Sequence, residues 1–271
     1  MKIIYAQGQT CNQFWIYTNF IAEALEKKEH IAFWVPDITL NSFPNLVDSE
    51  FIHFLLYSKK LAKLIGYRTY IRLIAIIFCN KYSISFLKYF FKVVPFHEFI
   101  VVDVFTKKSS FRVKYLQEIR KIFTPENAVL NEVNSFFKSI KKENQLLIGL
   151  HIRYGDYRQF ENGKYFYSVA QYKRVLENIA AIFTGYQLLF FVACSEQINL
   201  PEFESLNYKI MPNTSAVKDL YCLSRVDFLV GPPSTFSAWA SLYGDIPLYF
   251  IESIDKEIKL NDFQPIKNTW L

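Results

Sequence analysis

The feature that most constrains the fold of this chain is an apolar run that ends in charge. Residues 146–152 read Leu-Leu-Ile-Gly-Leu-His-Ile, and Arg153 and Asp156 follow directly. Such a continuous run is typical of a strand buried on both faces, and such strands belong to parallel sheets. Ligands of open parallel sheets bind beyond the carboxyl ends of the strands. His151, Arg153 and Asp156 therefore lie where the predicted sheet would bind a ligand.

Beyond this run, helix and strand patterns alternate. Ser168 and Gln171 form a capping box at the start of an amphipathic helix that we expect to end near Phe183. The remaining patterns predict strands at 188–193, 228–230 and 247–251 and helices at 215–224 and 235–243. This alternation predicts a parallel, Rossmann-like domain with right-handed crossovers.

The amino-terminal half opens in the same way. Strand patterns at residues 2–6 and 31–35 flank a helix expected over about 13–27. Residues 8–12 are expected to form a tight, ligand-facing turn before that helix. An apolar run at 99–104 predicts a further strand.

A polar stretch at residues 141–144 marks the predicted boundary between the halves. It follows a helix expected to end near Ser139 and to start with Thr124 as its capping residue and a proline in the first helical position. We therefore expect an α/β domain over residues 1–143 and a Rossmann-like domain over residues 144–271.

A basic, aromatic stretch interrupts the amino-terminal half. Between Phe51 and Lys92 the chain has no acidic residue, while lysines and arginines alternate with Phe, Tyr, Leu and Ile. We expect two or three helices with a basic face, as an insertion over about 48–95. The insertion fits either a helical unit packed on its own aromatic side chains or a surface that contacts an anionic acceptor or docks on an anionic membrane. The sequence does not choose between these interpretations.

The composition of the chain limits which ligands it is expected to bind and in which cellular compartment it is expected to work. The formal net charge of +6 suits an anionic ligand, but the chain has no RNP motif, zinc-finger spacing or Gly-Arg tract, so nucleic acid is not an expected partner. The four cysteines are scattered without neighbouring histidines, which indicates free thiols in a reducing compartment rather than a zinc site. No apolar run reaches membrane-spanning length, and the first run is too short for a signal peptide. We expect a cytoplasmic protein, with contact at the inner face of the membrane as the alternative role of the basic stretch.

Arg153 is the strongest single candidate for chemistry. A guanidinium group pairs two oxygens of a phosphate and can neutralise charge on a leaving diphosphate. The alternative is a structural ion pair with Asp156, which would act as a general base or, as we prefer, orient the arginine. His151 fits a contact to a base or sugar edge, a proton shuttle or a buried core histidine.

A second anion site is predicted at residues 231–237, which read Gly-Pro-Pro-Ser-Thr-Phe-Ser between an apolar strand and a helix. The N–H groups and dipole of a helix N-terminus favour negative charge. Ser234 and Thr235 would hold the other side of the diphosphate that Arg153 binds. Plain capping of the helix is the alternative.

Three motifs resemble those of the bacterial alpha-1,2-fucosyltransferases, in the same order. Residues 8–13 resemble the Gly-Gly-Leu-Gly-Asn-Gln loop of that family, residues 151–157 its His-Val-Arg-Arg-Gly-Asp-Tyr motif, and residues 234–237 its Asn-Ser-Thr-Phe-Ser-Trp-Trp motif. Residues 191–196 and 219–224 are similar to its Phe-Ser-Asp-Asp and Asp-Leu-x-x-Met-Ser segments. The resemblance spans nearly the whole chain, although residues 40–142 are essentially unmatched.

The chain departs from these motifs at several places. Gln9 and Cys11 replace two glycines of the first loop, and Tyr154 stands where the family has its second arginine. Ser195, followed by Glu196, replaces one residue of the acidic pair, and Pro233 replaces the asparagine before the serine.

The resemblance implies a GT-B-like α/β fold with two Rossmann-like halves facing a cleft, the first half on the acceptor side. It also implies GDP-fucose as donor, inversion at the anomeric carbon and no metal or other cofactor. By position, Arg153 would bind the β-phosphate, while His151 and Asp219 would approach the guanine. The residues that would line the diphosphate or lie beside the donor across the cleft are Ser234, Thr235, Phe236, Gly8 and Asn12.

We therefore expect an inverting glycosyltransferase that transfers fucose from GDP-fucose to a glycan acceptor, with Arg153, Asn12 and Asp156 as its catalytic set. The base that deprotonates the acceptor hydroxyl is not assigned. Two alternatives stay open: a transferase that uses another nucleotide sugar, and an inactive nucleotide-binding or membrane-docked protein of a polysaccharide assembly system.

Overall fold

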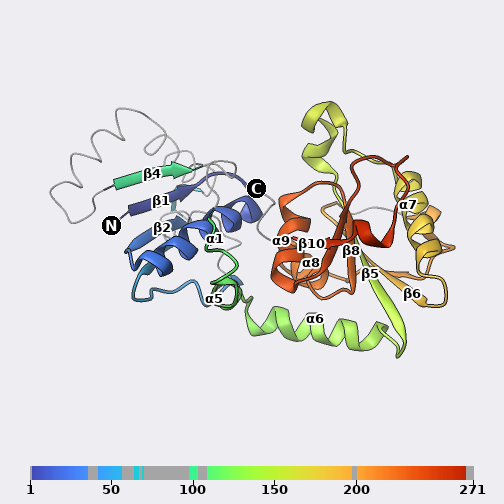
Figure 1. Ribbon diagram of the computed structural model, residues 1–271, viewed down its shortest axis with the longest axis horizontal. Coiled ribbons are helices and arrows are strands. Elements are labelled where there is room, and N and C mark those ends of the chain that lie inside the picture. The colour runs from blue at the N-terminus through green and yellow to red at the C-terminus, as the bar shows by residue number, and fades with distance from the viewer. Residues whose placement is uncertain are drawn as a thin grey trace. The chain divides into compact units, whose positions relative to one another are not determined.

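The computed structural model describes residues 2–35, 42–56, 64–66, 69, 98–102, 109–196 and 200–266 (Figure 1). The chain divides into two compact units, residues 1–126 and 127–270. The predicted boundary lay between residues 143 and 144, so the structure groups the helix before it with the second unit rather than the first.

The first unit is built on a four-stranded sheet in which all neighbours are parallel. Its strands, in the order β3-β2-β1-β4, are β3 (Ile52–Leu56), β2 (Ile31–Val35), β1 (Lys2–Ala6) and β4 (Glu98–Val102). The helix α1 (Thr10–Lys27) connects β1 to β2, and α5 (Leu116–Ile122) follows β4. Figure 1 shows β4, β1 and β2 side by side, with α1 in blue.

Two expectations for this unit were wrong in part. The first helix begins at Thr10, so Cys11 and Asn12 lie in its first turn rather than in the preceding loop. Residues 52–56 form strand β3, where the basic insertion was expected to be helical. Most of the stretch from Phe51 to Lys92 lies outside the described residues, and its predicted helices stay a prediction.

The second unit contains a six-stranded sheet of order β10-β9-β8-β5-β6-β7. Its strands are β5 (Gln145–Ile152), β6 (Gln187–Cys194), β7 (Tyr208–Lys209), β8 (Phe228–Gly231), β9 (Pro247–Phe250) and β10 (Gln264–Pro265). All pairs are parallel except β9 and β10. The helices α6 (Asn127–Ile140), α7 (Val169–Ile182), α8 (Ala216–Leu223) and α9 (Thr235–Gly244) precede or connect these strands. The short 3-10 helices are η2 (Gly155–Arg158), η3 (Phe160–Gly163), η4 (Pro201–Phe203) and η5 (Leu260–Asp262).

Local capping explains where several of these helices start. The predicted capping box is confirmed, because the Ser168 hydroxyl accepts from the backbone N–H of Gln171 and the Gln171 side chain accepts from that of Ser168. Ser215 caps α8 in the same way, by accepting from Lys218 N–H. The predicted cap at Thr124 is wrong: α6 starts at Asn127, and the Thr124 hydroxyl donates to the carbonyl oxygen of Arg120 at 2.9 Å.

The core of the second unit is centred on β5, whose last six residues are all buried. A Cβ atom on Gly149 would lie 3.0 Å from Leu223 and 3.1 Å from Val226. Glycine therefore lets the end of α8 pack directly against the middle of the strand. At Gly244 a Cβ would lie only 2.1 Å from the carbonyl oxygen of Ser224. The helix predicted at residues 235–243 extends one residue further, to Gly244, and Asp245 takes the left-handed conformation that ends it.

Both sheets reverse their order of strand addition once. In the second unit, β5 lies between β6 and β8, so the chain adds strands on one side of β5 before it returns to the other side. In the first unit, β1 lies between β2 and β4 in the same way. Such switch points leave a crevice at the carboxyl ends of the two diverging strands, where open α/β sheets bind ligands.

Candidate functional site

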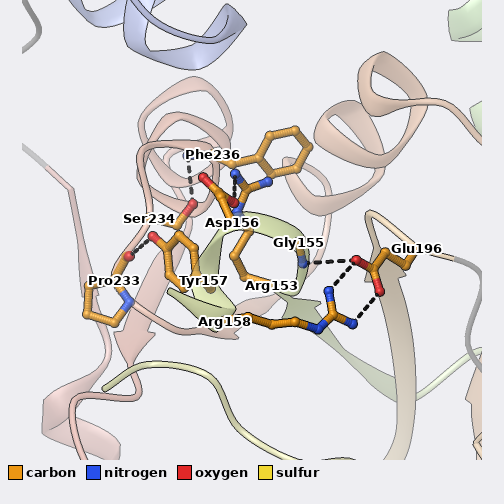
Figure 2. Close-up of polar contacts among 9 residues, drawn as sticks. All are labelled: Arg153, Gly155, Asp156, Tyr157, Arg158, Glu196, Pro233, Ser234 and Phe236. Carbon is orange, nitrogen blue, oxygen red and sulfur yellow. Dashed lines mark hydrogen bonds and ion pairs between the residues drawn. The ribbon is translucent and has the colours of Figure 1, made fainter. Parts of the chain in front are cut away.

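The loops after β5 and β8 flank the switch point of the second unit. Residues 153–158 follow β5, and residues 232–236 follow β8 and lead into α9. Figure 2 shows side chains from both loops converging on Arg153. The sequence placed its two candidate anion sites in these loops, and the structure brings them together.

Arg153 is held in place by its neighbours in the loop. Its Nη2 atom lies 2.8 Å from Oδ1 of Asp156, and its guanidinium carbon lies 5.2 Å from the centre of the Tyr157 ring. The arginine side chain is 16% exposed and the aspartate 54%. The predicted orienting ion pair is therefore present. A charged, oriented guanidinium at this edge is suited to bind an anionic oxygen.

His151 is buried, with 3% of its surface exposed, and points into the helix layer rather than into solvent. Its Nδ1 atom lies 2.8 Å from the Ser237 hydroxyl, and its ring lies 4.8 Å from that of Phe236. Burial, and then the charge of Arg153, lowers the pKa of His151 to about 3. The histidine is thus neutral near pH 7, which fits a core histidine and disfavours a proton shuttle. Its contact with a base stays a prediction.

The start of α9 forms the other side of the site. The Ser234 hydroxyl accepts from the backbone N–H of Phe236 at 3.1 Å, so the capping interpretation of this serine holds. The helix N-terminus lies at the carboxyl end of β8, where its dipole favours an anion. A Cβ on Gly231 would lie 3.0 Å from the carbonyl oxygen of His151, so glycine lets β8 end close beside β5.

Glu196, just after β6, holds the loop after β5 from the opposite side. Its Oε1 accepts from the backbone N–H of Gly155 at 3.0 Å and from Arg158 Nη1 at 2.7 Å. Its Oε2 accepts from Arg158 Nη2 at 2.8 Å (Figure 2). The guanidinium carbon of Arg158 also lies 5.5 Å from the ring centre of Tyr154, the residue that stands at the second arginine of the motif.

Asp219, in the first turn of α8, lies near the site. Burial raises the pKa of this carboxyl to about 6, and a 2.5 Å hydrogen bond from the Thr214 hydroxyl offsets part of the rise. Burial raises the pKa of the Cys194 thiol, at the carboxyl end of β6, and a hydrogen bond with the backbone of Glu196 offsets part of the rise. The charges of Glu196 and Asp219 raise this pKa further, and the charge of Arg153 lowers it. Asp219 and Arg153 therefore act on the same thiol, which places them in one neighbourhood.

The corresponding loop of the first unit also lies at a switch point. Gly8 has a φ of +95°, and a Cβ there would lie 2.6 Å from Nδ2 of Asn12. The carbonyl oxygen of Gly8 accepts from Gln13 Nε2 at 3.0 Å, and Gln7 N–H donates to the carbonyl oxygen of Val102 at 2.9 Å. The predicted position of Asn12 opposite the donor stays a prediction.

The model of glycosyl transferase family 11 matches residues 4–258. The chain belongs to this family. Its members are glycosyltransferases, so this family 11 chain is an enzyme of that class.

Solved structures share the fold at low identity. NodZ alpha-1,6-fucosyltransferase soaked with GDP-fucose matches with a TM-score of 0.59 and 14% identity, over 97% of this chain and 96% of NodZ; NodZ is also solved as the Bradyrhizobium fucosyltransferase. A FUT1 variant of Arabidopsis thaliana in complex with GDP matches with a TM-score of 0.55 and 12% identity, over 92% of this chain and 70% of that protein. POFUT1 in complex with GDP-fucose matches with a TM-score of 0.54 and 12% identity, over 90% and 94%. The expected GT-B-like α/β fold with parallel sheets is thereby confirmed. Comparison with curated proteins found no match.

The structure of this family 11 enzyme shows which of the predicted site residues lie together. At the switch point of the second unit it gathers His151, Arg153, Asp156, Ser234, Thr235 and Phe236, with Asp219 nearby and Gly8 and Asn12 in the first unit. Sequence reasoning missed the contacts of Tyr157, Arg158 and Glu196. A signal existed for the last two, because Arg158 and Glu196 carry opposite charges in the segments that follow two neighbouring parallel strands, and the carboxyl ends of such strands meet at one edge of a sheet.

Two features are absent from the described part of the family 11 enzyme. Within the described ranges, no group of three or more His, Cys, Asp and Glu side chains is arranged to hold a metal ion. Nor does any helix in those ranges combine the length and the apolar character needed to cross a membrane.

Proposed function

We propose that this family 11 enzyme transfers fucose from GDP-fucose to a hydroxyl group of a glycan acceptor, with inversion and without a metal ion, in an alpha-1,2 linkage. The observation that carries the proposal is the ion-paired Arg153 beside the start of α9 at a topological switch point. The motif resemblance supports the linkage. Structures of the same fold, NodZ and POFUT1, are described with GDP-fucose.

The chemistry asked of such a site is mainly electrostatic. When the bond between the sugar and the diphosphate breaks, negative charge builds on the leaving β-phosphate. Arg153 would pair with its oxygens, and the N–H groups in the first turn of α9 would stabilise the same charge from the other loop. The two loops thus provide positive potential that a metal ion supplies in other transferases. The acceptor hydroxyl must lose a proton to a base that we do not assign.

The nucleoside end of the donor is proposed to approach Asp219 and His151. A carboxyl with a pKa of about 6 is ionised near pH 7, so Asp219 can accept hydrogen bonds from the N–H groups of guanine. His151 is neutral near pH 7, and its imidazole ring can contact the guanine. Asn12, in the first turn of α1, is proposed to lie beside the donor from the first unit.

The proposal is tested by nucleotide binding and turnover. Calorimetry with GDP, UDP, CDP and GDP-fucose should show binding of the guanine nucleotides only, and GDP-fucose should be hydrolysed or its sugar transferred. Arg153→Ala should weaken GDP binding by 100-fold or more. Arg174→Ala is the control, because Arg174 forms an exposed ion pair with Asp255 on the same unit. Equal GDP affinity and turnover in Arg153→Ala and the parent chain would contradict the proposal.

The same measurements decide the alternatives. A chain that binds another nucleotide sugar has a different donor, and a chain that binds GDP-fucose without consuming it is inactive. Failure of every nucleotide to bind would support the alternative of a membrane-docked interaction protein. We also propose that the enzyme works in the cytoplasm and touches anionic membranes through residues 51–92, and sedimentation with anionic vesicles at low and high salt tests this because electrostatic docking weakens as salt rises.

A further inference from the structure

The loop that carries Arg153 is fastened on both sides by residues outside it. On one side the Tyr157 hydroxyl donates to the carbonyl oxygen of Pro233, before α9. On the other side Glu196 accepts three hydrogen bonds, one from Gly155 and two from Arg158. Figure 2 shows the loop between these two attachments.

Glu196 binds the residues on either side of the pair that contacts Arg153. Gly155 and Arg158 are bound by Glu196, and both residues between them, Asp156 and Tyr157, contact the guanidinium of Arg153. Fixing both ends of this four-residue turn fixes the carboxylate and the ring that orient the arginine.

The backbone of the turn also needs this attachment. Gly155 has a φ of +62°, a left-handed conformation, and its N–H group is the one that points to Glu196. The two parallel hydrogen bonds to Arg158 use both oxygens of the carboxylate, and this geometry holds a side chain in one orientation better than a single contact does. The contacts are partly exposed, at 49% for Arg158 and 36% for Glu196, so their value lies in geometry more than in stability.

We propose that Glu196 is a positioning residue for donor binding: it holds the turn from Gly155 to Arg158 so that Asp156 and Tyr157 aim Arg153 at the diphosphate. The inference rests on the proposed function, because it assumes that Arg153 binds the donor. A guanidinium that pairs two phosphate oxygens loses much of its effect when it is misplaced by about 1 Å. Glu196 does not itself touch the donor, and its effect must pass through Arg153.

Because a positioning residue must act through Arg153, three possible roles of Glu196 can be told apart: positioning Arg153, forming a surface ion pair that stabilises the fold, and contacting the nucleotide directly. If Glu196 acts through Arg153, removing it matters only while Arg153 is present. If it merely stabilises the fold, the loss follows the melting temperature. If it contacts the nucleotide directly, the losses from the two substitutions multiply.

The test is GDP affinity, by calorimetry, in the parent chain, Glu196→Ala, Arg153→Ala and the double variant. We expect Glu196→Ala to weaken GDP binding about tenfold, and to add less than twofold to the loss in Arg153→Ala. The control is Glu161→Gln, which removes an exposed ion pair with Lys164 in the next turn and should leave GDP affinity unchanged.

A conservative series adds a readout that a general loss of stability would not produce. Glu196→Gln retains an oxygen that accepts from Gly155, so its GDP affinity should lie between those of Glu196→Ala and the parent. The exchanged pair Arg158→Glu with Glu196→Arg restores the opposite charges but offers no acceptor to Gly155. We expect this pair to recover the melting temperature but not the GDP affinity.

The outcomes are distinguishable. Parent-like GDP affinity in a folded Glu196→Ala variant, or multiplied losses in the double variant, would overturn the positioning role and leave the proposed function standing. If the parent chain bound no GDP, the proposed function would fail and this inference with it. Faster hydrogen exchange at Gly155–Arg158 in Glu196→Ala, with GDP binding reduced, would support it.

Discussion

The hydroxyl of Tyr157 donates a hydrogen bond to the backbone carbonyl of Pro233, and this contact joins the two loops of the candidate site. The same ring lies under the guanidinium of Arg153. Tyr157 thus links the arginine that would bind one side of a diphosphate to the helix start that would bind the other.

Replacing Tyr157 with phenylalanine separates these two roles. Tyr157→Phe retains the ring beneath Arg153 but leaves the partly buried Pro233 carbonyl without this donor, which costs about 1–3 kcal/mol. We expect GDP affinity to fall severalfold with a modest drop in the free energy of unfolding. Calorimetry and urea unfolding measure both. Unchanged GDP affinity would show that the loops hold their places without this contact.

His151 should make the fold sensitive to acid. The pKa of His151 is about 6.5 in the unfolded chain and about 3 in the folded chain, so between these pH values only the unfolded chain binds the additional proton. The free energy of unfolding therefore falls as the pH drops from 6.5 towards 3, by about 3–5 kcal/mol in total. His151→Gln should show a flatter stability profile over this window. Urea unfolding at a series of pH values compares the two, and parallel profiles would contradict the prediction.

Asp219 should act in the opposite direction over part of the same window. The pKa of Asp219 is 3.8 in the unfolded chain and about 6 in the folded chain, so between these pH values the folded chain holds the proton more tightly. The contribution of Asp219 to the free energy of unfolding is therefore fully present below about pH 4, and about 3 kcal/mol of it is lost as the pH rises through 6. Asp219→Asn should therefore raise stability at pH 7.5 but not at pH 3.5, while it weakens GDP binding. Thr214→Val is a useful comparison, because it removes the hydrogen bond to the carboxylate, together with a long hydrogen bond to the carbonyl oxygen of Ser215, and leaves the carboxylate in place.

Gly8 should tolerate no side chain. In Gly8→Ala the new methyl group would meet Asn12 within 2.6 Å at a φ of +95°, and both the clash and the backbone strain oppose folding. Gly185→Ala provides the control, because Gly185 has a φ of +92° with nothing within 4 Å of its Cβ position. We expect Gly185→Ala to lower the free energy of unfolding by about 1–2 kcal/mol, and Gly8→Ala to lower it by clearly more. Equal melting temperatures would contradict the predicted clash.

Much of the second unit was predictable, because its signals are local. The apolar run that forms β5 and the capping box at Ser168 each specify an element from neighbouring residues alone. The two anion-site loops followed from strand ends, because parallel strands bring their carboxyl ends to one edge.

The parts that escaped prediction depend on distant contacts. Strands β7 and β10 each have two residues, too few for any periodicity, and exist because a neighbouring strand edge accepts them. The helix predicted at residues 235–243 ends one residue later, at Gly244, where the absence of a side chain makes room for the carbonyl oxygen of Ser224, just after α8. Glu196 was noted only as a departure from a motif, since its partners lie 38 and 41 residues away.

Strand β10 has a consequence for where this chain can be shortened. The family match ends at residue 258, while β10 pairs antiparallel with β9, and Phe263 beside it is buried in the core. The Ile266 N–H also donates to the Ser241 hydroxyl within α9. A fragment trimmed to the family match would uncover the edge of β9, and exposed strand edges pair with other molecules. Such a fragment should aggregate at concentrations where the full chain stays monodisperse, as light scattering would show, so residues 259–266 protect the sheet that carries the candidate site.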